Sequence, residues 1–291
     1  MNQYEAIHEQ FEVTNGRGET LRGDLRRPDV PEPVPVIVFC HGYRSFKDHL
    51  FFPYLALKLA RRGYGAVTFN LSGSGIGADL QSFSELPRLE SSTISQDLED
   101  LSCVLEAIGD GKVGRGRLDA DQIAVVGHGK GGAICLLAGA EEDRVKVVGT
   151  LATVSRLDAF GDEERRRWRK EGYLAYFDES LGREIRLQET MLDDLEQNAE
   201  RFDLVRAVEN LGKPLILMHG EEDHACEASE SERLYHRADK DLTRLVIFEK
   251  TGHNFGVSHP FVESNKEVER IIQILDAFIQ QSFAGQLPKD L

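Results

Sequence analysis

The fold of this 291-residue chain is decided by Ile123-Ala124-Val125-Val126-Gly127-His128-Gly129-Lys130-Gly131-Gly132-Ala133. The first four residues of this run are apolar and mostly β-branched, as in a strand that is buried on both faces. A turn packed with glycine follows, and small residues then open a helical pattern. The run therefore predicts a strand, a tight turn and a helix in immediate succession, which is the repeating unit of an α/β fold.

The glycines of the turn occupy the first, third and fifth positions of G-x-S-x-G, the pattern of a nucleophile elbow. Flanking glycines let the strand and the helix of such an elbow approach closely, and the central residue has a strained backbone at the top of the sheet. Here the central residue is Gly129. A glycine-rich turn can also hold a phosphate. However, the chain has no G-x-x-x-x-G-K-[ST] motif, and a dinucleotide fingerprint belongs in the first βαβ unit rather than in mid-chain.

Strand and helix patterns alternate on both sides of this turn. Two period-2 segments around Asn15-Gly16-Arg17-Gly18 predict an N-terminal β-hairpin. The expected strands are Gln10–Thr14, Thr20–Arg26, Val34–Cys40, Gly65–Phe69, Ile123–Val126, Val145–Leu151, Pro214–Met218 and Arg244–Phe248. The expected helices are Phe51–Arg62, Ile94–Ile108 (leucines on one face, acids on the other), Lys130–Gly139, Ala228–Arg237 and Val262–Phe283. This alternation predicts a mostly parallel central sheet with helices on both faces.

Residues 155–210 interrupt the alternation. They contain no buried-strand pattern, and a stretch of this length between core strands is more typical of an inserted helical element than of a loop. Within it, Gly182-Arg183-Glu184-Ile185 could turn a small hairpin. We expect an α/β core of residues 1–154 and 211–291, with 155–210 as a cap or lid over the carboxyl edge of the sheet, where ligands bind in open α/β folds. The alternative is an edge decoration remote from any site. The aromatic residues of this segment are Trp168, Tyr173, Tyr176 and Phe177.

Polar residues follow three further strands at their carboxyl ends. Leu215–Met218 is followed by His219-Gly220-Glu221-Glu222-Asp223, which places a carboxylate there. Leu245–Phe248 is followed by Glu249-Lys250-Thr251-Gly252-His253, which places an imidazole there. Nucleophile turn, then acid, then histidine is the chain order of α/β-hydrolase triads. Upstream, Phe39-Cys40-His41-Gly42-Tyr43 closes a strand with a loop that can aim a backbone N–H into the same pocket.

On these four motifs the chain resembles the α/β-hydrolase superfamily, and within it the bacterial dienelactone-hydrolase-like, esterase and acyl-peptidase-like members. The resemblance covers almost the whole chain. It implies that His253 is the general base, that Asp223 orients it, and that the N–H groups of Tyr43 and Lys130 form the oxyanion hole. It also implies a serine at position 129, where this chain has glycine.

The remaining expected site residues are His41, Gly42, His128 and Ser72, which line or support the pocket, His128 being packed behind the turn. Other interpretations of the motifs stay open. Asp223 could be one surface acid among several, and His253 could be a surface turn residue. Ala225-Cys226 stands where Val-Pro is frequent in the family, which leaves the geometry of the acid loop open.

Glycine at position 129 offers no hydroxyl, so no covalent acyl intermediate can form there. The expected function is therefore that of a serine-type hydrolase of carboxylic esters, or of amides or peptides, that binds its substrate with little or no turnover. A natural pseudo-hydrolase that binds or senses a small molecule is the alternative. A cofactor-free, non-hydrolytic enzyme that uses His253 as a base is a third hypothesis. The sequence leaves the substrate, the oligomeric state and the origin of Gly129 open.

Composition and charge argue against other classes. The net charge of −15 disfavours nucleic acid as a partner. The basic run Arg165-Arg166-Arg167 directly follows Asp162-Glu163-Glu164, a mixture typical of a solvated helix face. The N-terminal residues MNQYEAIHEQFEV lack the features of a signal peptide, and no apolar run approaches the about 18 residues of a membrane helix. We expect a cytoplasmic protein without membrane contact.

The cysteines do not suggest a disulfide framework or a metal site. The four are scattered and form no C-x-x-C pair. His219, His224 and Cys226 could together suggest a metal, but His219 closes a strand and is expected to pack. We expect no metal and no cofactor.

Overall fold

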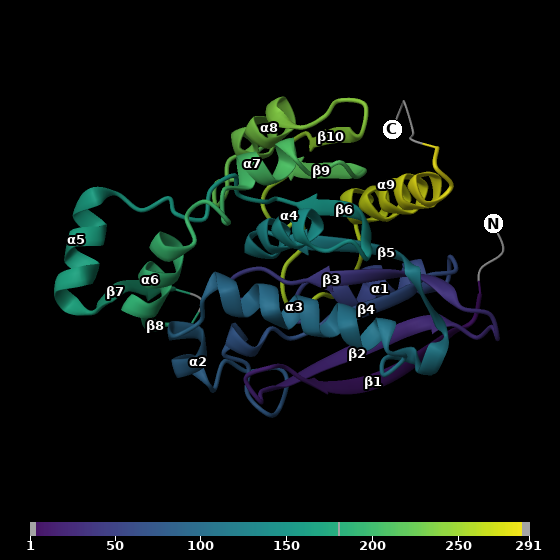
Figure 1. Ribbon diagram of the computed structural model, residues 1–291, viewed down its shortest axis with the longest axis horizontal. Helices are drawn as coiled ribbons and strands as arrows, with labels where there is room; N and C mark the ends of the chain where they lie inside the picture. Colours follow the sequence, from purple (N-terminus) through teal and green to yellow (C-terminus); the bar gives the residue numbers. More distant parts are fainter. Residues whose placement is uncertain (1–3, 180, 287–291) are drawn as a thin grey trace.

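The computed structural model describes residues 4–179 and 181–286. Within these residues an eight-stranded sheet has the order β1-β2-β4-β3-β5-β6-β9-β10 (Figure 1). Its strands are β1 (Ala6–Thr14), β2 (Thr20–Pro28), β3 (Val34–Cys40), β4 (Gly65–Phe69), β5 (Leu118–His128), β6 (Val145–Leu151), β9 (Leu215–Gly220) and β10 (Thr243–Phe248). β1 and β2 form the expected antiparallel hairpin, β2 pairs antiparallel with β4, and the other pairs are parallel. The predicted mostly parallel α/β sheet is confirmed.

Helices cover both faces of this sheet, as the alternation predicted (Figure 1). They are α1 (Phe52–Ala60), α3 (Ile94–Gly109), α4 (Lys130–Glu141), α8 (Ala228–Arg237) and α9 (Lys266–Phe283). The short helix α2 (Leu86–Glu90) belongs to a separate small cluster, in which Leu86 and Leu89 pack with Ile185. Apolar side chains of α1 and α9 form one core with the sheet, and those of α3, α4 and α8 form another. Burial of these two apolar layers supplies the main driving force for folding. α9 begins later than expected, because the Asn265 side chain accepts the N–H of Val268 and caps the helix there.

The acidic face of α3 is partly buried, although the pattern only separated acids from leucines. Asp97 and Asp100 are both almost inaccessible to solvent. Asp100 accepts hydrogen bonds from Asn15 (2.7 Å), from Arg17 (2.8 Å) and from the N–H of Ser72 (2.7 Å). These bonds join α3 to the β1–β2 turn and to the loop after β4. They also satisfy the Asp100 carboxylate, because a buried charge is costly unless it is hydrogen-bonded or paired.

Residues 155–210, which we call the insert, lie in the chain between β6 and β9. They form α5 (Asp162–Glu171), β7 (Tyr173–Asp178), β8 (Arg183–Gln188), α6 (Glu189–Gln197) and α7 (Leu204–Glu209). β7 and β8 make a separate antiparallel pair, the hairpin indicated by the sequence around Gly182. The insert is thus not purely helical, and α5 lies at the end of the molecule away from α9 (Figure 1).

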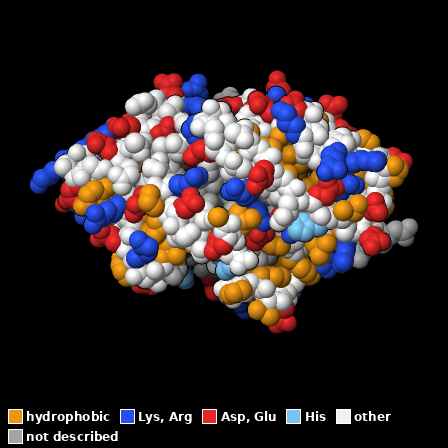
Figure 2. All heavy atoms as spheres, turned by 90° about the horizontal axis from the view of Figure 1, so that it is seen from below, with side chains coloured by type: hydrophobic (Ala, Val, Ile, Leu, Met, Phe, Trp, Pro, Cys, Tyr) orange, Lys and Arg blue, Asp and Glu red, His pale blue; other side chains and the backbone are white. Residues whose placement is uncertain are grey.

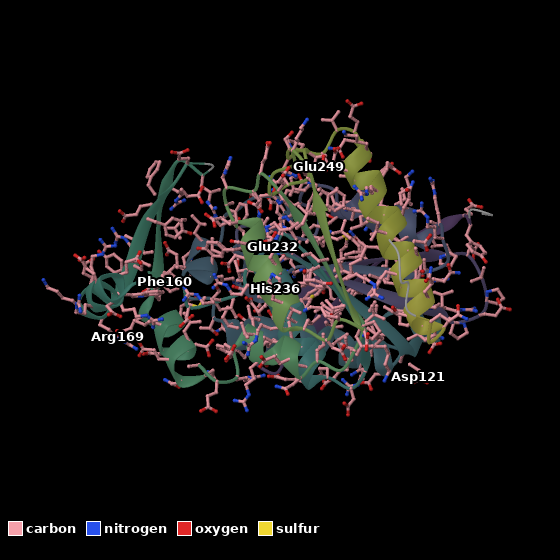
Figure 3. All side chains as sticks on the ribbon, turned by 90° about the horizontal axis from the view of Figure 1, so that it is seen from above. Asp121, Phe160, Arg169, Glu232, His236 and Glu249 are labelled. Atoms are coloured by element: carbon pink, nitrogen blue, oxygen red, sulfur yellow. The ribbon has the colours of Figure 1, made fainter. Side chains whose placement is uncertain are left out.

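The insert has its own small core. The Trp168 side chain is fully buried and packs edge-on against Phe160, with ring centroids 5.2 Å apart. Arg169 donates hydrogen bonds to Glu189 and Glu196 (2.7 Å each) and so joins α5 to α6. Figure 3 labels Phe160 and Arg169 in this part of the molecule. Trp168 therefore stabilises the insert and is not available to line a pocket.

The surface carries charges of both signs. On the face seen in Figure 2, acidic and basic side chains are interspersed and no broad area is basic alone. In the described part of the chain, no helix has the length and apolarity needed to cross a bilayer.

Candidate active site

The turn between β5 and α4 holds Gly129 in a conformation that few residues with a side chain adopt, with φ 54° and ψ −122°. Three hydrogen bonds fix it. The Gly129 N–H donates to the carbonyl of Leu151 (2.9 Å), and the Gly129 carbonyl accepts from Thr153 Oγ1 (3.1 Å) and from the N–H of Gly132 (3.0 Å). The surrounding structure therefore determines this backbone conformation, whichever residue stands there.

The glycines of the turn differ in what a side chain would meet. A Cβ at Gly127 would lie 2.1 Å from the carbonyl oxygen of Gly131, so only glycine permits the close contact of strand and helix. An ideal Cβ at Gly129 meets only the ring of His253, at 3.6 Å from Nε2 and 3.8 Å from Cε1. Position 129 therefore has room for a side chain directly in front of this imidazole.

The structure brings together His253 and Asp223 from the loops after β10 and β9. His253 Nδ1 lies 2.7 Å from Asp223 Oδ2, while Asp223 Oδ1 accepts the N–H groups of Ala225 and Cys226 (2.9 Å each). Asp223 is buried, and the His253 side chain is 29% exposed. Because a carboxylate can only accept, Nδ1 carries the proton and Nε2 is left as an acceptor that faces position 129.

A second histidine supports Asp223 from behind. His219 Nε2 donates to the Cys226 carbonyl (2.8 Å) and lies 3.2 Å from Asp223 Oδ2, while Nδ1 accepts from the Ser231 hydroxyl (2.6 Å). Burial opposes ionisation of Asp223, but the hydrogen bonds from His219, His253 and the Cys226 N–H hold the pKa of this carboxyl well below its usual range. Asp223 is therefore a carboxylate. Apart from the place of His219 at the end of β9, no sequence signal indicated this role.

The two expected oxyanion donors are the backbone amides of Tyr43 and Lys130. Among the described residues, neither the Tyr43 N–H nor the Lys130 N–H makes a hydrogen bond. Their loops are in contact, because a Cβ at Gly42 would lie 2.9 Å from the His128 carbonyl oxygen. Two free amides beside the turn can receive a negatively charged oxygen.

The Lys130 side chain connects α4 to α3 and to the loop after β3. Its ammonium lies 2.6 Å from Asp97 Oδ2 and 5.6 Å from the centre of the Tyr43 ring. Within the described chain no donor reaches Asp97 Oδ1. Burial raises the pKa of Asp97, although the positive charge of Lys130 acts in the opposite direction. Through these two contacts, the Lys130 ammonium connects the start of α4 to α3 and to the side chain of Tyr43.

His41 and His128 are buried supports of the two loops. His41 Nε2 accepts the N–H of Leu71 (3.1 Å) and Nδ1 donates to the Gly42 carbonyl (2.9 Å). His128 Nε2 donates to the His253 carbonyl (3.0 Å), and the two rings are 4.6 Å apart at their centres. Burial lowers the pKa of His41 and of His128 to about 3, so both are neutral near pH 7.

Ser72 is hydrogen-bonded to the β1–β2 turn and to α3. Its hydroxyl accepts from Arg17 (2.9 Å), and its N–H donates to Asp100. No hydrogen bond joins it to His253 among the residues that the structure describes. Its expected place in the pocket stays a prediction.

The insert contacts the loop that holds the Tyr43 amide. The hydroxyl groups of Tyr43 and Tyr176 share a hydrogen bond, and Arg44 pairs with Asp178 at the end of β7. Burial and the bond to Tyr176 raise the pKa of the Tyr43 phenol. The β7–β8 hairpin is therefore anchored to the loop after β3. Whether the insert acts as a lid stays a prediction.

Two other clefts lie away from this turn. A cleft of about 410 Å³ runs between α4 and α7, and one of about 380 Å³ lies between α6, α7 and the chain after β6. Neither is lined by His253, Asp223 or Gly129, so neither holds a base or a nucleophile position. Within residues 4–179 and 181–286, no cluster of histidine, cysteine and carboxylate side chains is arranged to hold a metal.

Known proteins share the fold of this chain. The model of the alpha/beta hydrolase family matches residues 37–270. An uncharacterized peptidase, YuxL, of Bacillus subtilis (strain 168) is 26% identical over 263 residues, and the match covers 88% of this chain but only 37% of that protein.

Solved structures are similar over nearly the whole chain. The α/β hydrolase GrgF from Penicillium sp. sh18 gives a TM-score of 0.71 at 20% identity, covering 96% of this chain and 99% of that one. The acylaminoacyl peptidase of Pyrococcus horikoshii gives 0.69 at 23% identity, covering 99% and 43%. Est1E from Butyrivibrio proteoclasticus gives 0.69 at 16% identity, covering 94% and 99%. At these identities the structural likeness concerns the fold.

Proposed function

Because the chain belongs to the α/β-hydrolase family, we propose that it binds a small carboxylic ester, or an amide or peptide, beside Gly129 and turns it over slowly or not at all. The Tyr43 and Lys130 amides would hold the carbonyl oxygen, and His253, oriented by Asp223, would act as the base. The reaction of a complete site begins with attack by a serine hydroxyl on the carbonyl carbon. Gly129 removes that step and leaves the rest of the site in place.

One observation carries this proposal: the Cβ position of residue 129 lies 3.6 Å from His253 Nε2. A serine there has a C–O bond of about 1.4 Å. With an O···N hydrogen bond of about 2.8 Å, the angle at the hydroxyl oxygen is about 110°, which is good hydrogen-bond geometry. The base therefore stands where it could remove the proton of a serine hydroxyl, without any movement of the backbone.

The test is to install the serine. In a serine protease, loss of the nucleophile lowers kcat about a million-fold, so Gly129→Ser is expected to raise the hydrolysis of p-nitrophenyl butyrate by at least about a thousand-fold. The variant should also be labelled by a fluorophosphonate, which reacts only with an activated serine. Adding His253→Ala should abolish both effects.

His236→Ala is the matched control. His236 is exposed on α8 (Figure 3), and its loss should leave the activity of the Gly129→Ser protein unchanged. A Gly129→Ser protein that folds but shows neither turnover nor labelling would overturn the proposal. That result would favour the alternative, a binding or sensing protein, which Gly129 itself also supports.

A further inference from the structure

With glycine at position 129, the volume in front of His253 is left for a molecule that is not part of the chain. Apart from residue 129 and its two neighbours in the chain, the described atoms within 4 Å of the missing Cβ belong to the His253 ring. His253 Nε2 is an acceptor without a hydrogen-bonding partner in the described part of the chain. Asp223 holds the opposite nitrogen at 2.7 Å. This nitrogen can therefore accept from a donor that is placed beside Gly129.

We propose that this space binds a small primary alcohol, of which methanol is the simplest, and that His253 activates the alcohol for direct attack on a bound ester. The inference rests on the proposed function, because it uses the same base and the same oxyanion donors. The chain would then transfer an acyl group to an alcohol in one displacement, without an acyl-enzyme.

The size of the missing side chain and the charge of the competing nucleophiles favour an alcohol over an amine or water. The missing group is a hydroxymethyl, so a molecule with one carbon and one hydroxyl fills the volume most closely. A free alcohol must remain at van der Waals distance from Gly129 Cα, whereas a serine hydroxyl is attached to that atom through Cβ. The oxygen of the free alcohol therefore lies about 1 Å farther from the backbone than a serine oxygen does, and nearer the substrate. A primary amine near pH 7 is an ammonium ion without a lone pair for attack. Water fits the space but leaves the methyl volume unfilled.

The step balances without a co-reactant. The alcohol oxygen forms a bond to the ester carbonyl carbon while its proton passes to His253 Nε2. The negative charge on the carbonyl oxygen is held by the N–H groups of Tyr43 and Lys130. The bond to the leaving alkoxide or phenoxide then breaks, and the proton on Nε2 passes to that oxygen. The products are a new ester and the original alcohol or phenol, and the base is returned to its starting state.

Fixing the alcohol beside the ester gives the step its advantage over solution, because an oriented nucleophile acts at a high effective concentration. The protein holds the components rigidly. Gly129 is fixed by three hydrogen bonds. The His253 ring is held by Asp223 on one side and packs at a tilt of 57° against His128 on another.

The experiment is chemical rescue of the unsubstituted protein. Release of p-nitrophenolate from p-nitrophenyl butyrate is followed as methanol is raised to molar concentration, and methyl butyrate is quantified by gas chromatography. We expect the enzymatic rate to rise about tenfold and to saturate. We also expect the share of methyl butyrate to exceed the mole ratio of methanol to water. tert-Butanol at equal molarity should give neither effect, because its tertiary carbon hinders attack of the hydroxyl on an ester.

Two variants locate the rescue. His253→Ala should remove it. Gly129→Ala, whose Cβ occupies the space, should also remove it while keeping a native circular dichroism spectrum. If methanol changes neither rate nor product ratio relative to His253→Ala, or if Gly129→Ala is rescued equally well, the inference is wrong. The proposed function is judged separately: an active, labelled Gly129→Ser protein would uphold it even when rescue fails, and an inert one would overturn it.

Discussion

Replacing Gly129 by alanine should lower the free energy of unfolding, by an amount that the backbone geometry allows us to estimate. A residue with a Cβ at φ 54° and ψ −122° carries a strain of about 1–3 kcal/mol. Loss of the extra freedom of glycine in the unfolded chain returns about 0.5–1 kcal/mol. The new Cβ meets its nearest neighbour at 3.6 Å, which is ordinary contact, so overlap adds nothing. The expected net loss is roughly 1 kcal/mol.

Serine at the same position should be less destabilising than alanine. It bears the same backbone strain, but its hydroxyl can donate to His253 Nε2, and such a bond contributes about 0.5–1.5 kcal/mol. In a His253→Ala background that bond is absent, so Gly129→Ser should cost as much as Gly129→Ala. A double-mutant cycle over positions 129 and 253 therefore isolates the hydrogen bond from the strain.

The assay is equilibrium unfolding in urea, with thermal melts in support. In domains of about 150–250 residues, a change of 1 kcal/mol in the free energy of unfolding shifts Tm by about 2–4 °C. Gly212→Ala is the matched control, since Gly212 has φ 58° and an open space around its Cβ position, far along the chain from the turn. A Gly129→Ala protein as stable as the unsubstituted one would refute the strain, and absence of coupling in the cycle would refute the hydrogen bond.

Three further outcomes are expected. In the Gly129→Ser background, Asp223→Asn should lower kcat about 10⁴-fold with little change in KM, measured by ester hydrolysis, because the base loses its orientation. Lys130→Met should destabilise the fold by about 3–5 kcal/mol near neutral pH by leaving the buried Asp97 unpaired. The folded state raises the pKa of Asp97. The buried Asp97 carboxylate therefore destabilises the fold increasingly as the pH rises above about 3.9, the pKa of aspartate in the unfolded chain. Urea unfolding should therefore show a smaller cost at pH 5 than at pH 8, and an equal cost would contradict the ion-pair account. Trp168→Ala should loosen the insert by about 3–5 kcal/mol, visible as faster proteolysis within residues 155–210, and unchanged cleavage would argue against its core role.

Much of the fold could be predicted because its signals are local. Buried parallel strands give unbroken apolar runs, and the turn after Val126 is marked by glycines that the packing requires. The expected base and acid could be found for a related reason: each follows a strand, and parallel strands present their carboxyl ends at one edge of the sheet. His253, Asp223 and Gly129 are expected at that edge because each of them follows the end of a parallel strand.

What the sequence did not reveal depends on distant contacts. Asp97 lies on a polar face of its helix, and its burial follows only from the packing of Lys130 and Tyr43 around it. His219 supports Asp223 through geometry that no spacing encodes. Trp168 is one of four aromatic residues in the insert, and its place in the core of the insert follows only from the packing around it. Such roles depend on the tertiary arrangement rather than on periodicity.

The unequal surroundings of the glycines in the turn bear on how this protein could have evolved. A side chain at Gly127 would overlap the backbone, whereas one at Gly129 meets only an imidazole ring. The glycine codons GGT and GGC become the serine codons AGT and AGC by a single base change. Loss or recovery of the nucleophile is therefore one mutational step that requires no compensating change in packing. A gene of this kind could move between a catalytic and a binding state while selection on the fold continued without interruption.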